Sequence, residues 1–300
     1  LAVATKQIKL GFAVAQMSLH HPVRMAEQLA LIDNLSKGRL IVGLGRGTSH
    51  NIYDYRGYGL APDEAQERLL ESEEIMLKAW TTENLEHKGK FWDLWLPALR
   101  PRPYTKPHPY IIRACSGEAS MLTMAREGRP FLMNVQSDAI TRHRMDLYRE
   151  TMRASGFDDA HVAAAVDESW VWRNIFIAET DAEAERIGIP LFEAQREQRA
   201  SMRERVIAER GESMAKPGET GIAPAAPTTT PVARNVTEHS LICGSPATVA
   251  ERLAAIDGIG VGGIILQFRV GPSPYEITEN NIRLFMAKVA PEFKSTSTAS

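Results

Sequence analysis

The chain has 300 residues, of which 44% are hydrophobic and 24% charged, a composition typical of globular proteins. Its formal net charge of −2 argues against nucleic acid or an anionic membrane surface as a partner. No run of about 18 apolar residues occurs, so we expect no transmembrane helix. The two cysteines, Cys115 and Cys243, form no CxxC motif and favour a reduced, cytoplasmic chain. The eight histidines show no metal-binding spacing, so no metal is assigned.

Short apolar runs alternate with helical patterns along the chain. Strands are expected at residues 8–15, 39–45, 110–115, 130–135, 171–178 and 262–268. These runs contain few alternating polar residues, as in parallel strands that are buried on both faces. Helices are expected at residues 22–35, 62–80, 117–128, 180–210, 246–256 and 275–290. The alternation predicts an α/β fold, either a barrel or a doubly wound sheet.

Two observations favour a barrel over a nucleotide-binding sheet. No GxGxxG motif follows any strand, which argues against a Rossmann dinucleotide site. The pattern contains six βα-type units, whereas a (β/α)8 barrel needs eight. Because the first strand starts abruptly at residue 8, we expect that two units are absent at the front.

Two stretches interrupt the alternation. Residues 97–109 contain five prolines and predict an extended surface loop. Residues 213–236 are rich in Ala, Pro, Thr and Gly, and they predict either a mobile insertion that acts as a lid or a plain surface loop. We expect one domain over residues 1–294 and a disordered tail at 295–300.

The segment that ends the second strand is the first candidate site. It reads Gly43-Leu44-Gly45-Arg46-Gly47, so an arginine with a glycine on each side follows a short apolar strand. Arginine carries a fork of donors that fits phosphate, and glycine lets an anion approach the backbone closely. Arg46 is therefore a candidate phosphate ligand, and the alternative interpretation is a solvated turn arginine.

The end of the third strand is the second candidate site. Ser116, Gly117, Glu118 and Ser120 follow the apolar run 110–115 and open a helix. The first amides of a helix are free donors at its positive end, and the two serines add hydroxyl groups. This turn could close around a phosphate together with Arg46, and the alternative is that Ser116 only caps the helix.

With these residues in view, the chain resembles the bacterial luciferase-like flavin-dependent monooxygenase family. The resemblance covers nearly the whole chain and is specific in the combination of its motifs. The matching stretches are residues 10–14 leading to Leu19-His20-His21-Pro22, residues 31–39 leading to Arg46-Gly47, Tyr53-Asp54-Tyr55-Arg56-Gly57-Tyr58-Gly59, the proline-rich lead into Ser116-Gly117-Glu118, and Cys243-Gly244-Ser245-Pro246.

The resemblance implies a (β/α)8 barrel that binds reduced FMN at the C-terminal face of its strands. Arg46 matches the family's arginine for the flavin phosphate. Ser116, Gly117, Glu118 and Ser120 match its phosphate-binding turn. Ala13 and Val14 match the strand end beside the flavin ring, where the family can have a non-proline cis peptide. The family's catalytic histidine belongs to a strand that would precede residue 8, so no catalytic acid or base is assigned here.

The function implied by the resemblance is that of a monooxygenase, an oxidoreductase that incorporates molecular oxygen. Reduced FMN, supplied by a separate flavin reductase, would react with O2 to oxygenate a small organic substrate. Two alternatives are a deazaflavin-dependent oxidoreductase on the same fold and a non-catalytic flavin-binding remnant. A homodimer is expected for the full-length form.

Overall fold

The computed structural model describes residues 1–47, 52–210 and 236–293. Contacts between residues divide the chain into two compact units, which are described separately. The first unit comprises Leu1–Cys115 with Arg205–Ala226, and the second comprises Ser116–Glu204 with Pro227–Ser300. The expected single domain over 1–294 stays a prediction. The expected insertion at 213–236, apart from Val236, and the expected tail at 295–300 lie outside the described residues.

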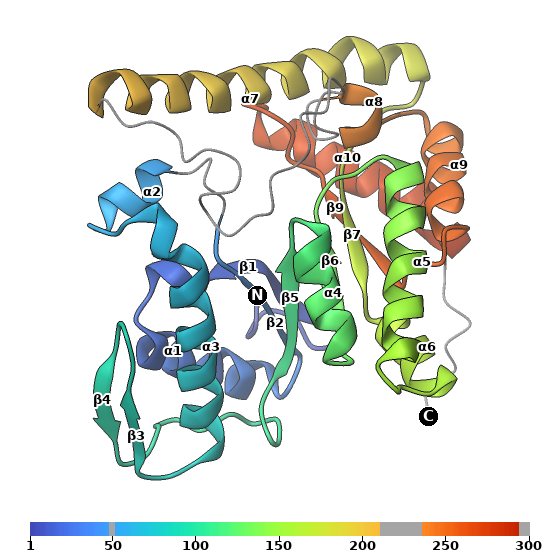
Figure 1. The fold of residues 1–300 in the computed structure, drawn as a ribbon. Coiled ribbons are helices and arrows are strands. Elements are labelled where there is room, and N and C mark those ends of the chain that lie inside the picture. The colour runs from blue at the N-terminus through green and yellow to red at the C-terminus, as the bar shows by residue number, and fades with distance from the viewer. Residues whose placement is uncertain (48–51, 211–235, 294–300) are drawn as a thin grey trace. The chain divides into compact units, whose positions relative to one another are not determined.

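The first unit is built on three parallel strands (Figure 1). They are β1 (Leu10–Gln16), β2 (Leu40–Gly45) and β5 (Tyr110–Cys115). Leu10 pairs with Leu40 in β1 and β2, and Ile41 pairs with Tyr110 in β2 and β5. The register of β1 shifts by one residue between Ala13 and Ala15. All of β2 is buried, as its unbroken apolar pattern predicts.

Helices and short turns connect these strands. The elements are η1 (Met17–Leu19), α1 (Pro22–Ser36), α2 (Ile52–Gly57), η3 (Pro62–Glu64) and α3 (Ala65–Thr81). Pro22 stands at the first turn of α1, and the helix ends where Lys37 and Gly38 both take a positive φ, of 55° and 81°. The predicted boundaries of this helix are therefore confirmed.

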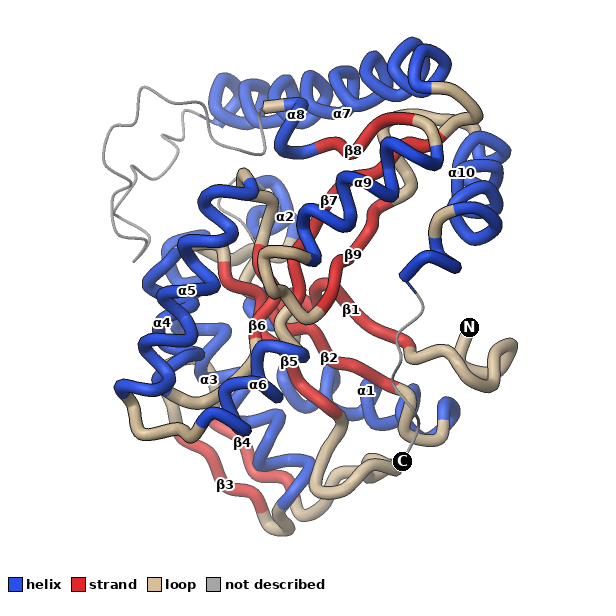
Figure 2. The backbone as a smooth tube through the Cα atoms, turned by 90° about the vertical axis from the view of Figure 1, so that its right-hand side faces the viewer, coloured by secondary structure: helices blue, strands red, loops and turns tan. Residues whose placement is uncertain are grey.

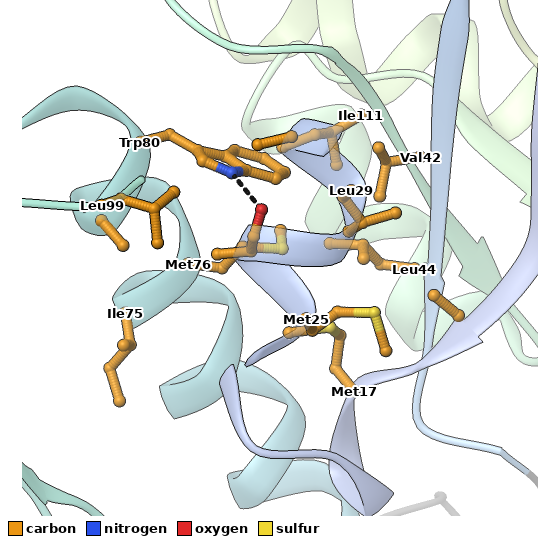
Figure 3. Close-up of a cluster of buried hydrophobic side chains, with 14 of the residues drawn as sticks. Met17, Met25, Leu29, Val42, Leu44, Ile75, Met76, Trp80, Leu99 and Ile111 are labelled. Atoms are coloured by element: carbon orange, nitrogen blue, oxygen red, sulfur yellow. Dashed lines mark hydrogen bonds between the residues drawn. The ribbon is translucent and has the colours of Figure 1, made fainter. Parts of the chain in front are cut away.

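The core of the first unit lies between α1, α3 and the strands (Figure 3). Met25 and Leu29 on α1 pack with Met76 and Trp80 on α3, and all four side chains are buried. The Trp80 indole nitrogen donates a hydrogen bond to the Ala26 carbonyl at 3.0 Å. This bond satisfies the only polar atom of a large buried side chain and fixes the two helices against each other.

A two-stranded antiparallel hairpin, β3 (Leu85–Lys88) and β4 (Asp93–Leu96), follows α3 (Figure 2). The sequence did not predict it. Glu71 on α3 organises its turn, because its carboxylate accepts hydrogen bonds from the backbone N–H groups of Phe91 and Trp92 and contacts the ring of His87. The proline-rich loop after it contains two cis X-Pro bonds, at Pro101 and Pro107.

Among its described residues, the second unit contains four strands, and all of their pairings are parallel. They are β6 (Phe131–Met133), β7 (Trp170–Ile177), β8 (Leu241–Gly244) and β9 (Gly263–Gln267). β7 pairs with each of the other three, and Figure 2 shows β8 and β9 running beside it. The list of six expected strands was incomplete, because β8 was interpreted only as a turn before a helix.

The helices of the second unit are α4 (Glu118–Arg126), α5 (Asp138–Ala154), α6 (Asp159–Asp167), α7 (Asp181–Arg210), α8 (Thr237–Ser240), α9 (Pro246–Asp257) and α10 (Tyr275–Lys288), with the last turn η5 (Ala290–Phe293). The Ser245 side chain accepts from the Thr248 N–H and caps α9, which begins at residue 246 as predicted. Thr180 accepts from the Glu183 N–H at 3.2 Å and starts α7 as expected. α5 and α6 were not predicted.

Candidate functional site

Arg46 directly follows β2, at the C-terminal end of that strand. The residue before it, Gly45, pairs with Gln16 and faces β1 so closely that an added Cβ would lie 2.6 Å from a methyl carbon of Val14. The residue after it, Gly47, has φ of 78°, and a Cβ there would meet the Gln16 amide nitrogen at 2.5 Å. Glycine is therefore required on both sides of the arginine.

The Arg46 backbone is held by two hydroxyl groups. Its carbonyl accepts a hydrogen bond from Ser18 Oγ at 2.5 Å and another from the Tyr55 hydroxyl. Burial lowers the pKa of the Arg46 guanidinium, and its charge interaction with Tyr55 acts in the opposite direction. A half-buried guanidinium has lost part of its hydration, so an anionic ligand placed against it would restore favourable interactions.

Ala13 and Val14 lie on the neighbouring strand, β1. The peptide bond between them is cis, as the resemblance implied. Ala13 is exposed, whereas Val14 is half-buried against Gly45. The structure therefore places Val14 against Gly45, the residue before Arg46, while Ala13 pairs with Gly43 nearer the middle of the strand pair.

A groove of about 500 Å³ runs along β1. Phe12, Val14, Gln16 and His20 line one side, and residues of α1 from Met25 to Ile32 line the other. His20 is partly buried, which lowers its pKa, and its ring contacts the edge of Tyr58 at 5.9 Å between centroids. At neutral pH this histidine is therefore an uncharged group at the end of an apolar groove.

The second group of candidate residues belongs to the second unit. Gly117 is the N-cap of α4, so the alternative interpretation of Ser116 as a helix cap is wrong. Ser116 and Glu118 are exposed, and an added Cβ at Gly117 would meet no described atom within 4 Å. The Ser120 hydroxyl donates a hydrogen bond to the Gly117 carbonyl at 2.8 Å, so its proton is already used within the first turn of the helix. The donors left at this helix end are the backbone amides of the first turn and the Ser116 hydroxyl.

Two residues that contact Arg46 were missed by sequence reasoning. Ser18 lies 28 residues before Arg46 and Tyr55 lies nine residues after it. Tyr55 belongs to a stretch that matches the family, but no role followed from the match. No pattern in the sequence marks either residue as a partner of the Arg46 carbonyl.

Within residues 1–47, 52–210 and 236–293, no group of three or more His, Cys, Asp or Glu side chains is placed to hold a metal ion. Over the same residues, no helix is both long enough and apolar enough to span a membrane.

The chain was compared with known proteins. The curated relatives that it matches include the oxygenase component of a flavin-dependent trigonelline monooxygenase from Acinetobacter baylyi, which is 29% identical over 59% of this chain and 54% of the relative. The chain spans between about a third and three fifths of the length of the first curated relatives it matches.

Solved structures show the same fold. The oxygenating constituent of 3,6-diketocamphane monooxygenase from Pseudomonas putida, solved in complex with FMN, superposes with a TM-score of 0.69 at 21% identity, over 97% of this chain and 81% of that one. An F420-dependent secondary alcohol dehydrogenase superposes with a TM-score of 0.69 at 13% identity, over 96% of this chain and 81% of that one. These two structural similarities establish the α/β fold and nothing further about this chain.

The family model described as luciferase-like monooxygenase matches residues 1–262, which is most of the chain. The resemblance that the motifs indicated is therefore confirmed, and the chain belongs to the luciferase-like monooxygenase family.

Proposed function

We propose that this chain is the flavin-binding part of a monooxygenase that uses reduced FMN and O2 to oxygenate a small organic substrate. The observation that carries the proposal is the placement of Arg46 beside Val14 at the C-terminal end of the β1–β2 pair. In α/β folds, ligands bind at the carboxyl ends of the parallel strands. Family membership adds support, because relatives of this chain are flavin-dependent monooxygenases.

The residues present fit a flavin phosphate. Arg46 supplies a cation that is half-buried, and Gly47 gives the backbone after it the positive φ that this turn requires. The turn at Ser116 and Gly117 supplies free helix amides beside open space, where a phosphate oxygen would be favoured. In the proposal, Arg46, Ser116, Gly117, Glu118 and Ser120 hold the phosphate end, and Ala13 and Val14 lie beside the ring.

Reduced FMN supplies the electrons that activate O2. The chain's own residues bind and orient the cofactor, and the apolar side chains around Val14 and Phe12 limit the access of water. A separate reductase is proposed as the source of reduced FMN, because the trigonelline enzyme is named as an oxygenase component. Among the described residues, neither Cys115 nor Cys243 forms a disulfide, as the proposed reduced, cytoplasmic chain requires.

We also propose that two further βα units complete the barrel beside β1. Within the described residues, β1 pairs with β2 alone, and Phe12 and Leu31 beside the groove are 40% and 50% exposed. A further strand and helix would cover this apolar surface. Light scattering tests the idea: the 300-residue chain should self-associate, and a form with the two units should be a dispersed homodimer. A monodisperse short chain that binds flavin as tightly as the longer form would contradict it.

Titration of Arg46→Ala with FMN tests the proposed function. Loss of a charge-assisted hydrogen bond to phosphate removes roughly 1.5–3 kcal/mol, so FMN should bind roughly tenfold to a hundredfold more weakly. The matched control is Arg24→Ala, which removes an exposed arginine of the same unit whose partner is Glu27. Unchanged affinity in a folded Arg46→Ala protein would contradict the assignment.

A further inference from the structure

Three segments that are distant in the sequence meet at one backbone oxygen atom. The Arg46 carbonyl receives hydrogen bonds from Ser18 in η1 and from Tyr55 in α2, and the two hydroxyl oxygens lie 3.1 Å apart. A carbonyl oxygen has two lone pairs, so it can accept both donors at once. The end of β2 is thus fixed to the segment that follows β1 and to α2.

The two hydroxyl groups reach the carbonyl from a buried position. The Tyr55 side chain is 1% exposed and packs with Leu19 and Ala65, and Ser18 is 3% exposed. Burying a hydroxyl without a partner is unfavourable, and here the Arg46 carbonyl is the partner of both. Burial also raises the pKa of Tyr55, with hydrogen bonding to Ser18 and the charge of Arg46 acting against it, so the phenol keeps its proton and donates at neutral pH.

The two hydrogen bonds fix the backbone from which the arginine side chain extends. A peptide group is planar, so two hydrogen bonds to its oxygen fix the plane between Arg46 and Gly47. Gly47 follows with a positive φ of 78°, a backbone conformation that favours glycine, and it lies close to the Gln16 side chain. An arginine fork binds phosphate best when its backbone is already held in place, since less freedom is then lost on binding.

We propose that Tyr55 and Ser18 are positioning residues that aim the Arg46 guanidinium at the cofactor phosphate, and that this pair sets the preference of the site for a phosphorylated flavin over its dephosphorylated form. The inference rests on the proposed function, in which Arg46 binds the flavin phosphate. Neither hydroxyl needs to touch the cofactor, because both act through the Arg46 backbone.

The test compares the dissociation constants of reduced FMN and reduced riboflavin, measured by anaerobic calorimetry. Riboflavin lacks the phosphate, so the ratio of the two constants isolates the phosphate contribution. The variants are Arg46→Ala, Tyr55→Phe, Ser18→Ala and the double variant Tyr55→Phe/Arg46→Ala. Tyr58→Phe is the matched control, because Tyr58 lies three residues after Tyr55 and is 59% exposed. Thermal unfolding of each variant reports any effect on the fold.

If the proposal is correct, Tyr55→Phe reduces the preference for FMN over riboflavin by roughly threefold to tenfold, the loss expected for one hydrogen bond. Ser18→Ala also reduces the preference for FMN, and the affinity for riboflavin stays constant in both variants. When Arg46 is already alanine, Tyr55→Phe causes no further loss of the preference. Equal weakening of both flavins, or a lower unfolding temperature with an unchanged ratio, shows a structural role only and overturns the inference.

If the proposed binding of FMN phosphate by Arg46 is wrong, the same measurements give a different result from the one expected when only the positioning role is wrong. If the unaltered chain shows no preference for FMN, or Arg46→Ala leaves the preference intact, Arg46 does not bind the phosphate and both proposals fall. If Arg46→Ala abolishes the preference and Tyr55→Phe leaves it unchanged, the phosphate assignment stands and the positioning role alone is wrong.

Discussion

Arg113 on β5 donates a hydrogen bond to Glu73 on α3, and both side chains are buried within the first unit. The Nε atom of Arg113 is buried and has no hydrogen-bond partner among the described residues. Removing two charges from water costs free energy, which their mutual attraction and hydrogen bonding must offset. If either partner is lost, the other becomes an uncompensated charge between a helix and the sheet.

Glu73→Gln should therefore lower the free energy of unfolding by about 3–5 kcal/mol, measured by urea denaturation. The next residue offers a matched control. Glu74 pairs with Lys78 at 2.6 Å, but both side chains are about half exposed, so Glu74→Gln should change stability by only ~0–1 kcal/mol. Equal effects of the two substitutions would show that the buried pair contributes no more than a surface pair.

Gly45→Ala should disturb the candidate site. The new methyl group would lie 2.6 Å from a methyl carbon of Val14, so β1 and β2 must shift apart at the end where Arg46 lies. Overpacking of this kind costs roughly 1–3 kcal/mol, and FMN affinity should fall with it. Gly57→Ala is the control, because a Cβ at Gly57 meets no described atom within 4 Å. Flavin binding that is insensitive to Gly45→Ala would place the cofactor elsewhere.

The two thiols should be unreactive in the folded protein. Burial, followed by the nearby carboxylates of Glu185 and Asp181, raises the pKa of Cys243 to about 12, and Cys115 is 2% exposed. Because the thiolate is the reactive form, a disulfide reagent at pH 8 should modify neither residue until the chain is unfolded. Rapid modification of either cysteine in the native protein would contradict the burial.

The raised pKa of Cys243 also affects the stability of the fold at high pH. The unfolded chain loses the Cys243 proton near its ordinary pKa of 9.0, whereas the folded chain keeps it to about pH 12. The unfolded state is therefore favoured progressively as the pH rises through this window. Cys243→Ser should make the fall in stability between about pH 9 and pH 12 less steep, as measured by denaturation at a series of pH values.

Asp33 should control the order of the proline-rich loop. Its buried carboxylate accepts from the Thr105 N–H at 2.8 Å and from the Thr105 hydroxyl at 3.1 Å. Asp33→Ala removes both acceptors, so amide hydrogens of residues 97–109 should exchange faster, and stability should fall by roughly 1–3 kcal/mol. Unchanged exchange in the loop would show that its order comes from the cis prolines and their packing.

β2 was predictable because it is a continuous apolar run that is buried along its whole length. β7 was predictable from its apolar residues on either side of Arg173 and Asn174. The β3–β4 hairpin was not predictable, because Glu71 organises it from α3, about twenty residues away in the sequence. α5 carried a usable signal that was missed: Ser137 caps it, and its buried residues Thr141, Met145, Tyr148 and Met152 have helical spacing.

For the site, Arg46 was proposed from the glycines and the strand end that surround it in the sequence, whereas the cis bond between Ala13 and Val14 was expected only from the family resemblance. The contacts of Ser18 and Tyr55 with the Arg46 carbonyl were not identified. A single backbone oxygen that binds two side chains from other elements leaves no periodic or compositional pattern. Such contacts follow only from the tertiary structure.

Anaerobic competition between reduced FMN and reduced F420 decides which of the two cofactors this chain binds. We expect FMN to bind at least about tenfold more tightly, the equivalent of about 1.4 kcal/mol, and we expect this advantage to depend on Arg46. A chain that binds F420 more tightly would belong to the deazaflavin-dependent alternative. A chain that binds neither cofactor would contradict the proposed flavin site altogether.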